Sequence, residues 1–221
     1  MHKFTIIKPY KKVIPLWLYR FIGVFMVSHF IYLSIRCFYK GEPENILWVS
    51  HIGTLIGGIG AITQSRLLIS IALVSLAGHH SFWMVDTFTW FFTGSFPFGT
   101  TTYLKDAYVL DWLQSANHFF SMPFLLILGY FQGGIRRHVW AGSSLLFAIL
   151  AVLSYFISPV SSNVNSVHQL WPGLDTSFLA NLDQLPAALY IGALILINTM
   201  GNYLPAYIII VLLIGTFNDD T

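Results

Sequence analysis

Imidazole and carboxylate side chains lie inside stretches of this sequence that otherwise carry almost no charge. The run SLAGHHSFWMVD at 75–86 holds three of them, and two further apolar runs hold the others. The set comprises His51, His79, His80, Asp86, Asp111 and His118. Neutral imidazole is the commonest protein ligand for transition metals. Three such ligands with one open position turn a bound water into a nucleophile near neutral pH. These residue types therefore indicate a metal site that would support hydrolysis.

Helical spacing places these residues on polar stripes, because residues three, four or seven positions apart share a helix face. One stripe contains Asp111, Ser115 and His118, and a second contains His79 and Asp86. A stripe of ionisable groups facing lipid costs several kcal/mol, so we expect both stripes to face the bundle interior or water.

The predicted metal ligands are His51, His79 or His80, and His118. His79 and His80 project about 100° apart around a helix, so one is expected to bind the metal while the other donates a supporting hydrogen bond. The candidate catalytic residues are Asp86, Asp111 and Ser115. Either aspartate would complete the coordination shell, orient an imidazole or act as general base. A divalent metal, with zinc favoured, is the expected cofactor.

Composition identifies the elements that must position these residues. Hydrophobic residues make up 56% of the 221 residues and charged residues only 9%, against about 25% charged in soluble domains. The sequence therefore predicts an all-α, polytopic membrane bundle, since a spanning segment must satisfy its own backbone hydrogen bonds. We expect a single transmembrane domain over 1–221 and no strand. The six predicted helices cover 16–37, 46–64, 67–92, 108–131, 139–158 and 186–216.

The distribution of Lys and Arg predicts the orientation of these helices. Basic residues concentrate in the N-terminal tail and in the loops around Arg66 and Arg136, which places both termini in the cytoplasm. The histidines then lie in the outer half of the bilayer, and the expected location is a bacterial inner (cytoplasmic) membrane. The net charge of +2 suggests no nucleic-acid partner. The single cysteine, Cys37, excludes an intramolecular disulfide and a cysteine-based zinc motif.

Three further features of the sequence carry structural expectations. The sixth segment is longer than the hydrocarbon core requires, and Gly201, Asn202 and Pro205 predict a kink or a functional break in it. Four glycines of the second segment, among them Gly53 and Gly58, predict close helix packing. The long outer loop 161–185 is expected to fold over the mouth of the second to fourth helices, with Trp171 anchored at the interface.

Three short motifs resemble an uncharacterised family of bacterial multi-pass membrane proteins. They are FGTTTYLKD at 98–106, SANHFFSMPFLLILGY at 115–130 and SSNVN at 161–165. The positions that carry the resemblance are Gly99, Thr101 or Thr102, Tyr103, Asp106, Ser115, His118, Pro123, Asn163 and Asn165. This family brings no established activity, but its pattern includes His118.

The spacing of Ser75 and His79 is also similar to the Ser-x-x-x-His element of the membrane hydrolases related to alkaline ceramidases and adiponectin receptors. Those enzymes pair this element with an Asp and a later His-x-x-x-His around zinc. Asp86 or Asp111 would be the second element here, and the third is missing. The resemblance implies zinc-dependent hydrolysis by analogy of chemistry.

Three classes of function follow from these observations. The first is a metal-dependent intramembrane enzyme, hydrolase-like, that acts on a membrane lipid or other amphiphile from the outer leaflet. The second is a transporter, or an accessory subunit of a membrane complex, whose polar stripes line a path. The third is a redox protein that binds b-type haem or quinone, with His51 and His118 as axial ligands.

Overall fold

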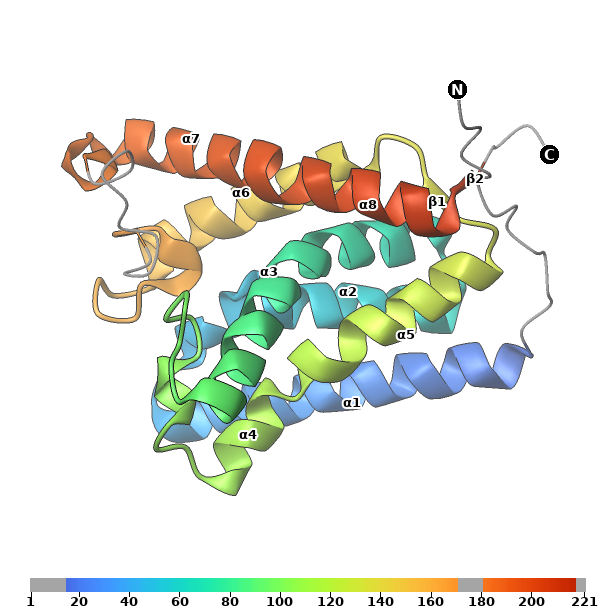
Figure 1. The fold of residues 1–221 in the computed structure, drawn as a ribbon, viewed down its shortest axis with the longest axis horizontal. Coiled ribbons are helices and arrows are strands. Elements are labelled where there is room, and N and C mark those ends of the chain that lie inside the picture. Colours follow the sequence, from blue (N-terminus) through green and yellow to red (C-terminus); the bar gives the residue numbers. More distant parts are fainter. Residues whose placement is uncertain (1–14, 171–180, 218–221) are drawn as a thin grey trace.

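Four long apolar helices dominate the computed structural model of the chain, which describes residues 15–170 and 181–217. They are α1 (Leu16–Lys40), α3 (Arg66–Thr93), α6 (Val139–Ile157) and the continuous stretch Ala187–Ile214. Each is long and apolar enough to cross a membrane. The chain is therefore an all-α membrane protein, as its composition predicts (Figure 1).

The other two predicted segments are also helical, but each is interrupted. The segment 46–64 forms a short 3₁₀ helix, η1 (Pro43–Leu47), followed by α2 (Val49–Thr63). The segment 108–131 forms α4 (Val109–Ser115) and α5 (Asn117–Phe131), which are separated at Ala116. Because α2 and α5 have 15 residues each, they are only about 22 Å long at 1.5 Å per residue.

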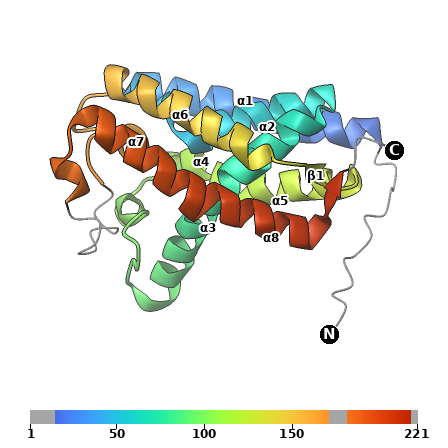
Figure 2. The same cartoon turned by 90° about the horizontal axis from the view of Figure 1, so that it is seen from above.

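Helix α3 is the centre of the bundle. In Figure 1 it lies between α2 and α5 on one side and the α6, α7 and α8 layer on the other, and Figure 2 shows its last turns projecting beyond the other helices. In its most apolar window 56% of the residues are buried, against 28% in each of the other three long helices. A polar residue on α3 is therefore far more enclosed by protein than one on α1 or α6.

Small residues allow α1, α2 and α3 to pack closely, as the glycines of the second segment predict. A Cβ at Gly58 would lie 3.1 Å from the carbonyl oxygen of Gly23 on α1. A Cβ at Gly53 would lie 2.6 Å from the side chain of Leu76 on α3. Only glycine permits such an approach, which brings the polar residues of α2 against α3.

The helix ends define two ends of the bundle. The two-residue strands β1 (Ile135–Arg136) and β2 (Thr216–Phe217) pair in parallel at one end, where α1 begins and α8 ends (Figure 1). We call this the β end, and the opposite end, which carries η1 and the 94–108 segment, the η1 end. The expectation of no strand was wrong, because two-residue strands are too short to show alternation.

The last apolar stretch is one interrupted helix. It consists of α7 (Ala187–Asn198), the π-helical turn η6 (Thr199–Tyr203) and α8 (Leu204–Ile214). The irregularity predicted from Gly201, Asn202 and Pro205 therefore takes the form of a π turn. Such a turn leaves the i→i−4 ladder and is frequent at functional sites.

Three further short helices of the described residues lie at the η1 end. They are η2 (Thr102–Leu104), η3 (Val164–Ser166) and η5 (Leu182–Gln184). Asn165 of η3 has a φ of 55° and holds the start of α2, because its Oδ1 accepts the amide hydrogen of Val49 and its Nδ2 donates to the carbonyl of Leu47. The first part of the predicted lid loop therefore packs on the start of α2. Trp171 lies outside the described residues.

Candidate functional site

His80 of α3 and His118 of α5 form a contacting pair of imidazoles inside the bundle. Their ring centroids are 4.5 Å apart with an interplanar angle of 44°. Trp83, one turn after His80 on α3, stacks on the ring of His118. The two ring centroids are 4.5 Å apart and the planes are inclined by 14°. His80 is fully buried and His118 is 9% exposed. We call these two residues the His80–His118 pair.

Hydrogen bonds to backbone carbonyls fix the tautomers of two neighbouring histidines. The Nδ1 of His118 lies 2.9 Å from the carbonyl oxygen of Ser115, and the Nδ1 of His51 lies 2.8 Å from that of Asn45. Since a carbonyl only accepts, each Nδ1 carries the hydrogen and donates it. The Nε2 of each neutral ring is then a free lone pair, which is the arrangement that metal-binding histidines adopt.

Both ring nitrogens of His80 are buried without a hydrogen-bond partner among the described residues. The Oδ1 of Asn117, a fully buried residue of α5, has no such partner either. One His80 nitrogen is a donor and the other an acceptor, so the ring leaves two polar groups unsatisfied. Each such group costs about 1 to 3 kcal/mol, which makes this ring the most under-satisfied side chain of the described bundle.

Polar residues of α2 and α5 interlock beside the His80–His118 pair. The Nδ2 of Asn117 donates to the carbonyl of Ser50 at 3.1 Å. The hydroxyls of Thr54 and Ser121 lie 3.1 Å apart, and both residues are fully buried. These bonds hold the first turns of α5 against α2. The break at Ala116 thus allows α5 to start where its first residues face the interior.

His79 points to the other side of α3, as the offset of adjacent helical residues predicts. Its Nε2 lies 3.2 Å from the hydroxyl of Tyr203 in the π turn, and its ring packs against Phe147 of α6. Of the two alternatives for the α3 ligand, the structure brings His80, not His79, into contact with His118.

The carboxylate of Asp86 is used to hold the 94–108 segment. Its Oδ1 accepts the amide of Phe98 at 2.8 Å, and its Oδ2 accepts the hydroxyl of Thr100 together with the amide and hydroxyl of Thr101. Asp86 is fully buried. These four bonds engage both carboxylate oxygens and bind the segment to α3.

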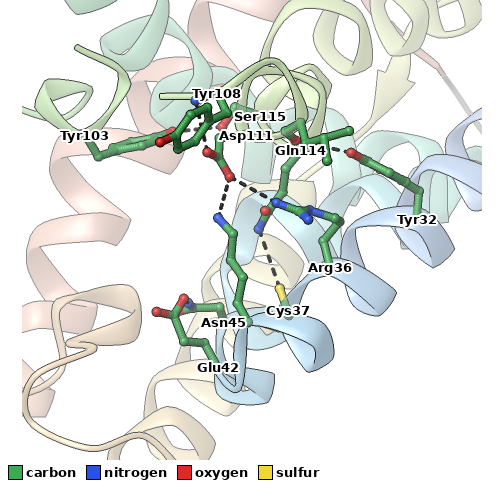
Figure 3. Close-up of polar contacts among 12 residues, drawn as sticks. Tyr32, Arg36, Cys37, Glu42, Asn45, Tyr103, Tyr108, Asp111, Gln114 and Ser115 are labelled. Atoms are coloured by element: carbon green, nitrogen blue, oxygen red, sulfur yellow. Dashed lines mark hydrogen bonds and ion pairs between the residues drawn. The ribbon is translucent and has the colours of Figure 1, made fainter. Parts of the chain in front are cut away.

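Asp111 is part of an ion cluster between α1 and α4, which Figure 3 shows. Its Oδ1 accepts from Lys40 at 2.6 Å and from Arg36 at 3.3 Å. The Lys40 ammonium is the largest influence that holds the pKa of the Asp111 carboxyl below its usual value. Gln114 extends the contact between these helices, since its amide donates to the sulfur of Cys37 at 3.7 Å. Asp111 therefore joins α4 to α1.

Tyr103 connects the 94–108 segment to the imidazole of His118. Its hydroxyl accepts the Nε1 hydrogen of Trp83 at 3.0 Å and lies 3.0 Å from the Oγ of Ser115 (Figure 3 includes the latter contact). Burial raises the pKa of Tyr103, against the opposing influence of these two bonds. The phenol is therefore neutral at physiological pH. Ser115, a candidate catalytic residue, instead shares its hydroxyl with Tyr103 and its carbonyl with His118.

Several motif residues therefore act as structural contacts. Thr101 and Tyr103 bind the 94–108 segment to α3, and Asn163 accepts the amides of His168 and Gln169 through its Oδ1. Sequence reasoning missed the roles of Trp83 and Asn117. The helical offset of three between His80 and Trp83, and the position of Asn117 beside His118, were the signals that could have identified them.

Within residues 15–170 and 181–217, no group of three or more His, Cys, Asp or Glu side chains is placed to hold one metal ion together. The closest approach to the predicted site is the His80–His118 pair, with His51 on the adjacent helix. No family model, curated protein or solved structure matches the chain.

Proposed function

We propose that this membrane protein binds a divalent transition metal of the zinc class through His80 and His118, with His51 as a third ligand. The single observation that carries the proposal is the His80 imidazole, fully buried with both nitrogens unpartnered beside His118. A cation between the two rings satisfies one nitrogen of each. The hydrogen bonds from the Nδ1 atoms of His51 and His118 support it, because they leave the Nε2 atoms as ligands.

The donor set determines which metal and which chemistry fit. Imidazole suits zinc, copper, iron and nickel, whereas calcium and magnesium prefer oxygen ligands. Asp86 and Asp111 are occupied by other donors, so hydrolysis with an aspartate base is not what this geometry favours. Metal binding is thus the function that the geometry supports best.

The proposal extends to the surroundings of the site. A membrane lipid or other amphiphile is the proposed source of the polar group that completes the coordination shell. We further propose that all six helical segments cross a bacterial cytoplasmic membrane with both termini in the cytoplasm, as the Lys and Arg distribution predicts. The η1 end then faces outward.

Metal content of the full-length protein tests the proposal. Wild type, His80→Gln, His118→Gln and His79→Gln would be purified in detergent and analysed by elemental mass spectrometry after zinc loading. We expect about one metal per chain in wild type, and loss in the His80 and His118 variants. His79→Gln is the matched control, since it is the adjacent residue on the same helix and contacts Tyr203. It should retain the metal.

Two outcomes would overturn the proposal. Wild type without metal, with unchanged melting on zinc addition, would favour a transporter or an accessory subunit instead. Equal loss in His79→Gln would show that the metal content reflects folding and not ligation.

Orientation has an independent test in a Cys37→Ala background. Tyr108→Cys at the η1 end and Arg137→Cys at the β end both replace exposed residues. A membrane-impermeant maleimide added to intact cells should label the first and not the second. The reverse pattern would place the site on the cytoplasmic side.

A further inference from the structure

Packing closes the His80–His118 pair from the β end. Below the pair, leucine and glycine fill the contact between α2, α3 and α5, with Leu73, Leu76 and Leu125 all fully buried. A Cβ at Gly57 would already lie 3.0 Å from the side chain of Leu125. A close-packed apolar interior admits neither water nor ions, so no route to the pair runs from this end.

On the η1 side of the pair, the 94–108 segment contacts α3 at Trp83 and Asp86, and its one helix is the three-residue η2. Two anchors hold this segment on α3. The Asp86 carboxylate accepts hydrogen bonds from the amides of Phe98 and Thr101, and the indole of Trp83 donates to the hydroxyl of Tyr103. These polar anchors are accompanied by apolar contacts, because Leu104 is buried and the rings of Phe96 and Phe98 pack on Trp90 and Phe82. Loss of a polar anchor removes a few hydrogen bonds and leaves these apolar contacts in place.

Tyr103 occupies a boundary position in this cover. The residue is 51% exposed, yet its hydroxyl reaches inward to Trp83 and to Ser115, whose carbonyl holds His118. A single side chain thus extends from the surface to the residues that pack on and orient the His118 ring. Among the described residues of the segment, Tyr103 is the one whose side chain is hydrogen-bonded to both α3 and α4.

We infer that the ligand of His80 and His118 enters from the η1 end beneath the 94–108 segment, and that Tyr103 closes this route and positions His118. The inference rests on the proposed function in that it describes access to the same site. The opening of the segment, however, is measurable whether or not a metal is bound.

Diethyl pyrocarbonate supplies that measurement, because it acylates the unprotonated nitrogen of a neutral imidazole. The chelator-treated, full-length protein would be labelled in detergent, and the rates at His80 and His118 followed by peptide mass spectrometry. Tyr103→Phe keeps the ring and removes the hydroxyl. Losing one or two hydrogen bonds changes an opening equilibrium about five- to thirty-fold, so both histidines should react faster by that factor.

Matched controls make the result specific. His79, whose ring contacts Tyr203 and Phe147, should keep its rate in the same Tyr103→Phe sample. Tyr190→Phe removes the hydroxyl bond to the Ser166 carbonyl in the other η1-end loop, and it should leave His80 and His118 unchanged. A second variant, Thr101→Val, removes one of the bonds to Asp86 and should give a smaller increase than Tyr103→Phe.

The outcomes separate this inference from the metal proposal. Unchanged rates at His80 and His118 in Tyr103→Phe, with a folded sample by circular dichroism, would overturn the route. An equal rise in Tyr190→Phe would assign the cover to the 161–185 loop instead. If wild type binds metal, zinc loss to a chelator should accelerate in Tyr103→Phe by the same factor. A purely structural role of Tyr103 would lower the melting temperature but leave the ratio of the His80 and His79 labelling rates unchanged.

Discussion

The side-chain oxygen of Asn202 points directly at Gly78, so that a methyl group at Gly78 would coincide with the Asn202 Oδ1. Asn202 belongs to the π turn, and Gly78 precedes the two histidines on α3. The Oδ1 is buried and has no hydrogen-bond partner among the described residues, and contact with the glycine Cα is a weak substitute for one. The absence of a side chain at Gly78 therefore determines how the π turn packs on α3.

This contact predicts a compensating pair of substitutions. Gly78→Ala should destabilise the protein by about 1 to 3 kcal/mol, the usual cost of overpacking. Asn202→Ala in the same chain should recover most of that loss. Melting of the single and double variants in detergent measures the coupling. Gly192→Ala is the control, since nothing lies within 4 Å of a Cβ there, and it should not destabilise. Additive losses in the double variant would contradict the contact.

Removing the charge of Asp86 should release the 94–108 segment. Asp86→Asn replaces an acceptor of four hydrogen bonds by a neutral group in which one oxygen remains an acceptor. The NH2 group that replaces the other oxygen faces the amide of either Phe98 or Thr101, and it cannot accept from that amide. Hydrogen exchange at those two amides should accelerate by at least about tenfold, since bonds to a charged group contribute about 1.5 to 3 kcal/mol each. Asp106→Asn, at an exposed position of the same segment, should leave the exchange unchanged. Protection that persists in Asp86→Asn would refute the anchoring role.

Asn165 combines a left-handed backbone with three side-chain hydrogen bonds, and two variants separate these contributions. Asn165→Gly keeps access to the φ of 55° but loses the bonds to Val49, Leu47 and Ser154. Asn165→Ala loses the bonds and adds strain. Both should lower the free energy of unfolding, measured by melting in detergent, and the alanine variant should lose about 1 kcal/mol more. Ser162→Ala, which removes only the bond to Glu44, should have a small effect. A glycine variant as stable as wild type would show that the three bonds do not matter.

The ion cluster of Asp111 predicts a specific acid sensitivity. The pKa of this carboxyl is lowered in the folded protein, mainly by Lys40. Its contribution to stability is therefore present above the unfolded pKa, and it is lost as the pH falls through the lowered folded pKa. Asp111→Asn should flatten the acid side of a melting profile from pH 7 to pH 3, and salt should weaken the effect because Lys40 is partly exposed. An unchanged profile in the variant would assign the acid sensitivity to other groups.

Periodicity and length predicted the helices well, because an apolar segment in a membrane satisfies its own backbone hydrogen bonds by forming a helix. What they could not supply is where a helix is interrupted. Ala116 separates α4 from α5 although nothing in its residue type breaks a helix, while Pro123 lies inside α5 without ending it. Tertiary contacts decide such positions, and the anchoring of Asn117 on Ser50 is one that a single sequence does not reveal.

The candidate site was predicted in part. Spacing identified His118 and the divergence of His79 and His80, since both follow from the angle between adjacent helical residues. It could not distinguish a carboxylate that faces a site from one that binds a loop. Asp86 and Asp111 lie on the same helix faces as the histidines by spacing. Their side chains instead bind Thr101 and Lys40, which belong to other segments of the chain. The pattern therefore grouped residues that the fold separates.

The pairing of β1 with β2 has a consequence for the order in which the chain assembles during synthesis. The first strand precedes α6 and contacts α3, since the amide of Arg136 donates to the Ser70 hydroxyl. Its partner follows α8. The amide of Ile135 donates to the carbonyl of Gly215. This hydrogen bond therefore forms only after three further helices have been synthesised. The β end closes last, and nascent chains arrested before Thr216 should present this end to chaperones and proteases.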